Sequence, residues 1–330
     1  MAFDRRRISH FAPGWRWLAL GVAMLASPTP GGAETASPLP GLTIEVEGQR
    51  VFGASDFEAG LIPDLGLGAL RTLKLDDGNG WGGAIAIGYG WRNGWSGTVR
   101  YRRLEADRSG GPISDGVIAF AAADPLLPGG FLVGLAEART EVRSDMSRVD
   151  LEIASDVAFM GARGQIFGGV TYAAIDRDTA IVDTCSCAPR LLRLSSTFQG
   201  AGPKIGVRGA VPLGAAVRLV GGASVAALIG RSEFESASID PLAPQGTFKD
   251  EDTRVAAALD GEAGLAFALD AGTLTVGYRA DALIGALDTD QRVSEPFRAL
   301  GLPAIGDARD DVIAHGPFVR FAMPFAGTGD

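Results

Sequence analysis

Residues 85–102, IAIGYGWRNGWSGTVRYR, have the pattern of two β-strands joined by a tight turn. Apolar side chains alternate with small or polar ones on both sides of the turn, which is the period of a strand with one apolar face. Arg92-Asn93-Gly94 supplies the residue types that favour a short hairpin connection. After the turn, the polar positions include Arg100 and Arg102. The stretch therefore predicts a β-hairpin with one apolar face and one charged face.

The same period of two recurs along the rest of the chain. It marks strands within residues 42–47, 148–157, 166–172, 204–211, 217–225, 254–267, 274–284 and 318–325. Several of these approach the ~10 residues that a tilted membrane strand needs. Beyond the N-terminal leader, no segment comes near ~18 continuous apolar residues, so the sequence excludes helical membrane spans. We expect an all-β fold of about ten strands.

Connection lengths decide between a membrane barrel and a soluble β-sandwich. Short connections near Asn93, Gly161, Gly214 and Ala271 alternate strictly with long ones at 55–79, 105–146, 177–193, 231–252 and 287–311. Outer-membrane barrels have short periplasmic turns and longer external loops, whereas a sandwich has no reason to separate loop lengths. Aromatic residues near strand ends fit an interface girdle: Trp81, Trp91, Trp95, Phe321 and Phe325. We predict a closed antiparallel transmembrane barrel of about ten strands, with eight or twelve if one hairpin is miscounted.

The first 33 residues have the layout of a cleavable signal peptide. Arg5, Arg6 and Arg7 precede an apolar run over residues 15–26, and small residues follow before Glu34. The apolar run is too short to span a bilayer. We therefore expect export through the inner membrane, with residues 34–330 forming the barrel and its five long external loops. The predicted location is the outer membrane of a Gram-negative cell.

Charge narrows the range of partners. The full chain has 30 basic and 39 acidic side chains, and the leader carries four arginines and one aspartate, which leaves 26 and 38 and a net charge of −12. Such a chain would repel nucleic acid. We expect the apolar face to contact outer-membrane lipid and lipopolysaccharide, and the loops to meet any external ligand or partner. The alternating apolar set that ends at Phe325 is typical of the C-terminal strand read by the barrel-assembly machinery, although residues 326–330 follow it.

Four segments carry a resemblance to a known family. They are Leu42-Thr43-Ile44-Glu45-Val46-Glu47-Gly48, Arg148-Val149-Asp150-Leu151-Glu152, Phe198 to Gly206 (FQGAGPKIG) and His315-Gly316-Pro317-Phe318. With these, the chain resembles the Legionella major-outer-membrane-protein-like barrel family. The resemblance implies an outer-membrane barrel and brings no catalytic residues with it.

Strand parity places many charged side chains inside the barrel. The predicted lumen-lining set is Glu45, Glu47, Arg100, Arg102, Arg148, Asp150, Glu152, Asp156, Lys204, Arg208, Arg218, Arg254, Asp260, Glu262, Arg279, Asp281 and Arg320. A barrel of eight to ten strands has an interior roughly filled by side chains, and an unpaired buried charge is costly. We therefore predict a salt-bridged lumen in a protein of structural or surface-interaction type. The alternative is a narrow porin-like path for small solutes.

Catalytic and metal chemistry find little support. The only histidine after the leader, His315, follows Asp310 and Asp311, so a hydrolase at the external rim is a third hypothesis. Parity, however, places His315 on the outward face, and we expect neither catalysis nor a cofactor. Cys185 and Cys187 have one residue between them in a predicted external loop. They suggest a local disulfide, with a free or intermolecular couple as the alternative, and no further Cys or His completes a metal site.

Overall fold

A computed structural model describes most of the predicted barrel. The described residues are 41–54, 61–64, 69–72, 78–113, 138–159, 162–183, 190–239, 246–288 and 309–326. The expected signal peptide, the turn near Gly161 and the Cys185–Cys187 pair lie outside these ranges. Within the described ranges, no helix is long and apolar enough to cross a membrane.

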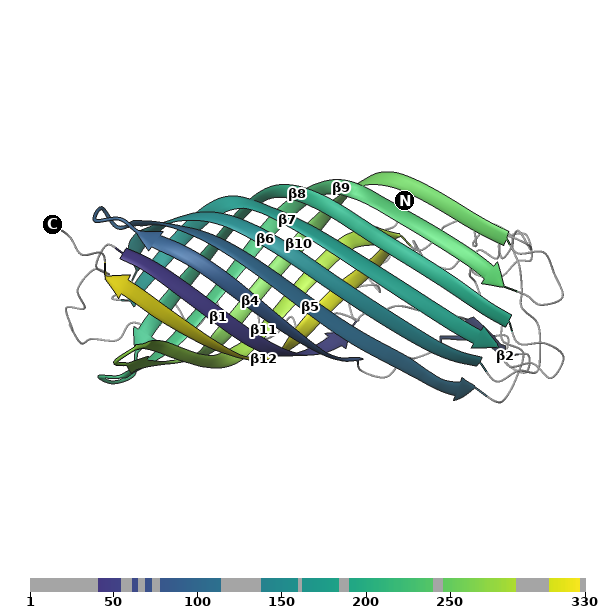
Figure 1. Cartoon of the computed structure of the whole chain (residues 1–330), viewed down its shortest axis with the longest axis horizontal. Coiled ribbons are helices and arrows are strands. Elements are labelled where there is room, and N and C mark those ends of the chain that lie inside the picture. The colour runs from purple at the N-terminus through teal and green to yellow at the C-terminus, as the bar shows by residue number, and fades with distance from the viewer. Residues whose placement is uncertain are drawn as a thin grey trace, which may run out of the picture.

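Ten strands close into one antiparallel barrel (Figure 1), which confirms the predicted fold class. The barrel strands are β1 (Gly41–Ala54), β4 (Gly78–Gly90), β5 (Trp95–Ile113), β6 (Ala138–Phe159), β7 (Ala162–Asp183), β8 (Arg190–Pro212), β9 (Val217–Ile239), β10 (Gly246–Leu269), β11 (Gly272–Asp288) and β12 (Arg309–Ala326). Each strand pairs with its sequence neighbours, and β1 closes the ring by pairing with β12. A separate two-stranded sheet of β2 (Leu61–Asp64) and β3 (Ala69–Thr72) lies in a connection that we expected to be a loop. Closure leaves the barrel without a sheet edge, so no edge exposes unpaired backbone groups. A strand-built protein can cross a bilayer only under this condition.

The turn between β4 and β5 has the geometry that its sequence predicts. The Trp91 N–H donates to the Trp95 carbonyl over 2.8 Å, and the Trp95 N–H donates to Asn93 Oδ1 over 3.3 Å. Gly94 has φ of 78°, a left-handed conformation that side chains disfavour. The Gly94 carbonyl also accepts a hydrogen bond from the Asp156 N–H on the next strand. The hairpin is therefore held both by its own turn and by β6.

An apolar belt surrounds the outside of the barrel near the short turns. Side chains such as Ile153, Ile205 and Val255 are 56%, 59% and 72% exposed. Trp91 and Trp95 are also exposed, next to the turn that joins β4 and β5. Because water would not stabilise a continuous apolar exterior, this face fits contact with lipid.

Six strands run well beyond that belt, and the predicted loop bounds 105–146, 177–193 and 231–252 were too wide. The strands β5 to β10 contain 19 to 24 residues each. A strand of 22 residues is about 70 Å long and, at a tilt of ~40°, covers roughly 55 Å along the barrel axis, whereas the apolar band of such barrels is ~25 Å tall. Figure 1 shows the far ends of β5 and β6 extending past β1 and β4. The barrel thus has a membrane half near the short turns and a protruding half.

Side-chain polarity inverts between the two halves. On β5, Val99 and Tyr101 are exposed while Arg102 is buried, but two residues later Leu104 is buried and Arg103 is exposed. The apolar face thus points outward in lipid and inward above it. The sequence pattern did not predict this inversion of polarity. Above the membrane the outward face of a strand is polar, and a stretch with many polar residues has the composition of a loop.

Candidate functional site

A layer of buried charges crosses the lumen in the membrane half. Arg148 and Asp150 project from β6, and Arg148 Nε lies 2.9 Å from Asp150 Oδ1. From the opposite part of the wall, Asp260 Oδ2 accepts from Arg148 Nη2 over 2.6 Å. Lys204 on β8 completes the group, with Nζ 2.7 Å from Glu152 Oε1 and 3.2 Å from Asp150 Oδ2. Each positive group in this part of the layer therefore contacts at least one carboxylate.

The rest of the charged layer joins β1, β5, β11 and β12. Arg102 Nη1 lies 2.7 Å from Asp281 Oδ1, and both side chains are almost fully buried. Arg279 pairs with Glu47, and Arg320 Nε lies 2.7 Å from Glu47 Oε2. The Glu47–Arg320 pair joins residues 273 positions apart in the chain. The two parts together form a layer of ion pairs that cross-links opposite walls, and we call it the charged layer.

An apolar layer lies on the side of the charged layer away from the short turns. Val51, Ile175, Phe198 and Leu228 have no exposed surface, and Leu283 is 2% exposed. All five belong to one cluster of buried side chains inside the barrel. Sequence reasoning missed this layer because the predicted strands stopped short of most of it. The signal that would have found it is the inward parity of apolar residues in the strand extensions. In both layers, buried side chains from different walls of the barrel meet across the lumen.

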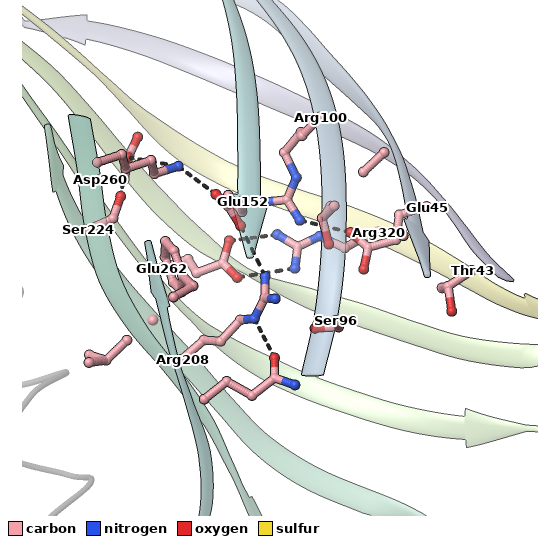
Figure 2. Close-up of a pocket in the computed structure, with 18 of the residues that line it drawn as sticks. Thr43, Glu45, Ser96, Arg100, Glu152, Arg208, Ser224, Asp260, Glu262 and Arg320 are labelled. Carbon is pink, nitrogen blue, oxygen red and sulfur yellow. Dashed lines mark hydrogen bonds and ion pairs between the residues drawn. The ribbon is translucent and has the colours of Figure 1, made fainter. Parts of the chain in front are cut away.

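On the other side of the charged layer, a cavity of about 310 Å³ opens among residues next to the short turns. Its wall includes Glu45, Arg100, Gln165, Arg208 and Glu262. Figure 2 shows Arg100, Arg208 and Arg320 reaching into this cavity from three strands. Since short turns are periplasmic in outer-membrane barrels, we call the cavity the periplasmic vestibule.

Most vestibule charges are paired, but Arg100 and Arg208 each retain N–H donors that have no acceptor among the described residues. Arg320 Nη2 donates to Glu262 Oε2 over 2.6 Å. Arg100 Nη2 donates to Glu45 Oε2 over 2.9 Å. Arg208 donates through Nε to the Gln165 side chain over 2.7 Å and through Nη1 to Glu152 over 3.3 Å.

Three predicted lumen residues lie apart from these layers. Asp156 and Arg218 are exposed at the rim, where Asp156 Oδ1 accepts from Gln165 Nε2 over 2.7 Å. Arg254 lies farther from the short turns and donates to the Leu287 carbonyl over 3.2 Å. The other fourteen predicted residues take part in the ion pairs of the charged layer or the vestibule.

His315 lies on the outer face of β12, among aromatic side chains. Its Nδ1 is 2.5 Å from the Tyr278 hydroxyl, and its ring centroid is 6.1 Å from that of Phe52. Asp311 instead accepts a hydrogen bond from the Gly285 N–H, where β11 is irregular and Gly285 has φ of 71°. Across the part of the chain that the structure describes, no three His, Cys, Asp or Glu side chains are grouped to hold a metal ion.

Solved structures of outer-membrane proteins include barrels that are similar to this chain. The outer membrane protease OmpT from Escherichia coli is 13% identical, with a TM-score of 0.51 over 88% of this chain and 99% of that chain. The translocator domain of the autotransporter NalP from Neisseria meningitidis is 11% identical, with a TM-score of 0.42 over 95% of this chain and 94% of that one. At such identities the likeness to OmpT shows the fold alone.

Sequence comparison identifies the family. A search of curated protein sequences found no match. The family model described as Legionella pneumophila major outer membrane protein precursor matches residues 53–325. That range covers most of the barrel, including β4 to β11, so the predicted resemblance is confirmed. The chain therefore belongs to the family of the Legionella pneumophila major outer membrane protein precursor and is an outer-membrane β-barrel protein.

Proposed function

We propose that this protein is a non-conducting barrel of structural and surface-interaction type, without catalytic activity. The observation that carries the proposal is that buried side chains cross the lumen in two layers. A solute that entered from the vestibule would first meet the charged layer, where Arg148, Asp150 and Asp281 are at most 5% exposed. It would then meet the apolar layer, a cluster of buried and packed side chains. Opening either layer would break ion pairs or apolar contacts in a low-dielectric interior.

The protruding half supports a role at the cell surface. Its outer face carries exposed ion pairs, such as Arg103 with Asp145 at 2.5 Å and Arg143 with Asp107 at 3.8 Å. By the strand lengths above, these pairs lie beyond the membrane belt. The protruding half would therefore hold the external connections well above the lipid. We infer that lipopolysaccharide surrounds the apolar belt and that an external partner would meet the connections between the protruding strands.

We propose that the protein is not an enzyme because of where its candidate catalytic groups, His315 and the buried carboxylates, lie. A general base needs access to a substrate and a partner that orients it. His315 faces outward among Tyr278 and Phe52 and does not line the vestibule. The buried carboxylates of the charged layer, for their part, are held by arginine and lysine.

Conductance in a planar bilayer tests the proposal. The chain without its predicted leader, refolded in detergent, is expected to insert without step-like conductance, while a general porin in the same bilayer serves as the positive control. The double variant Phe198→Ala and Leu228→Ala shortens two fully buried side chains of the apolar layer. It should stay closed as well, because the charged layer remains. Reproducible conductance steps from the unmodified protein would overturn the proposal and favour the narrow solute path.

A further inference from the structure

We propose that the periplasmic vestibule is a binding site for a small phosphate anion, either inorganic phosphate or a phosphomonoester. The wall of the vestibule carries more positive than negative charge although the whole chain has a net charge of −9. Seven basic side chains line it, against four acidic ones: Arg100, Arg102, Arg148, Lys204, Arg208, Arg279 and Arg320, and Glu45, Glu152, Asp260 and Glu262. A concave surface with an excess of one charge sign concentrates counter-ions of the other sign.

Four carboxylates share the wall with seven basic groups, and three further carboxylates of the charged layer lie behind it. Glu47, Asp150 and Asp281 are buried, and none of them lines the cavity. They hold the inner arginines in place through the ion pairs of the charged layer. An anion in the vestibule would thus face an excess of positive groups, because the three carboxylates that balance this excess lie behind the wall.

Two arginines present unused donors to the cavity. Arg208 uses Nε for Gln165 and Nη1 for Glu152, and its Nη2 forms no hydrogen bond to the described residues. Arg100 uses only Nη2, for Glu45, which leaves Nε and Nη1 without a described protein acceptor. These groups come from β8 and β5, on different walls, and Figure 2 shows both reaching into the same space. A guanidinium group binds phosphate oxygens through parallel N–H donors, so two convergent arginines favour an anion with several oxygens.

The size and closed end of the vestibule also fit a small ligand. A volume of about 310 Å³ corresponds to roughly ten waters at ~30 Å³ each and falls at the lower end of small-molecule sites. The charged layer forms its inner end, so an anion that enters would stop beside Arg208. The site would bind whether or not the lumen conducts: a protein that conducts and still binds phosphate would overturn the proposed function alone.

Calorimetric titration with inorganic phosphate tests the site. The protein would be refolded in an uncharged detergent at low ionic strength, because salt screens such contacts. We expect saturable binding with one phosphate per chain. Arg208→Gln should weaken it at least tenfold, as the loss of charge-assisted hydrogen bonds implies, and Arg100→Gln should also weaken it. Glu45→Gln should strengthen binding several-fold, because it removes a carboxylate that competes for Arg100.

Matched controls separate binding from folding. Arg231→Gln removes an arginine from the outer face of the protruding half and should leave phosphate affinity unchanged. Each variant should keep the mobility difference between unheated and boiled samples on a gel, which reports a closed barrel. If the unmodified protein shows no saturable binding, or if Arg208→Gln and Arg100→Gln bind as tightly as it does, the site does not exist.

A competition arm identifies the source of the phosphate. Glycerol phosphate represents soluble phosphomonoesters, and short-chain phosphatidic acid in the micelle represents a lipid headgroup. Displacement of inorganic phosphate by glycerol phosphate alone would support a soluble ligand. Displacement by the lipid as well would support the same site with a membrane source.

Discussion

The membrane half and the protruding half of the barrel use the same strands with opposite polarity. On β6, Leu151 and Ile153 face lipid while Asp150 is buried in the lumen. Farther along the same strand, Val142 is buried in the lumen and Arg143 is exposed. Backbone pairing continues through both halves without a break in register between β6 and β7. Strand pairing thus sets the fold, whereas the surrounding medium decides which face carries charge.

The largest expected effect comes from breaking the charged layer. Arg148→Leu would leave Asp150 and Asp260 without their main partner, and such a loss typically destabilises by about 3–5 kcal/mol. The measurement is urea unfolding in detergent micelles, followed by tryptophan fluorescence, because Trp91 and Trp95 lie on the outer face. The matched control in the protruding half is Arg103→Leu, which removes an exposed partner of Asp145. If both variants shifted the unfolding midpoint equally, the two halves would not differ in the way proposed here.

A charge on the lipid face is the next largest test. Ile153→Arg places a guanidinium in the apolar belt, which should cost roughly 2–4 kcal/mol if the position is near the bilayer midplane and less near its surface. Arg143→Ile makes the reverse exchange at an exposed position of the same strand. It should change the unfolding midpoint little and promote association of the protein in water instead. Refolding yields into lipid vesicles would separate the two, and an equal yield for Ile153→Arg and the unmodified chain would contradict the assignment of the belt.

The sequence predicted the membrane half better than the protruding half, for a physical reason. Around Asn93 and Gly94, turn chemistry and alternation agree, and the structure has the hairpin where they place it. The inward arginines and carboxylates follow from parity once the strands are known. Parity, however, does not tell which pairs meet across the lumen. Arg148 contacts Asp260, 112 residues away, only because the ring closes.

Two further features lay beyond the sequence pattern. The apolar layer was missed because residues such as Phe198 were not recognised as the continuation of membrane strands. The irregular pairing near Gly285 was missed as well, since one glycine in an apolar stretch gives no sign of a positive φ. The apolar layer and the irregular pairing near Gly285 both depend on closure of the barrel, because only the closed barrel brings the neighbouring strands and side chains together.

The smallest expected effect is the pH dependence of stability that comes from exposed ion pairs of the protruding half. There, a fall in pH should protonate the carboxylate of one ion pair at a time. The side-chain hydrogen bond from Arg231, with the nearby charge of Lys249, lowers the pKa of Glu251 below its ordinary value. A carboxyl group with a lowered pKa stabilises the fold above its unfolded pKa, near 4.5, and that contribution is lost as the pH falls through the folded value. Because all three side chains are exposed, water screens the pair and its contribution should be minor.

NMR titration of the Glu251 carboxyl carbon measures this directly. We expect a midpoint below the ordinary value in the unmodified protein and a return toward that value in Arg231→Gln, since the first cause of the shift is then removed. The charged layer should not respond to that change, so phosphate binding in the vestibule and the barrel's resistance to detergent should stay constant. A midpoint that does not move in Arg231→Gln would show that the outer pair does not form in solution. Only the membrane half would then hold its charges in fixed partnerships.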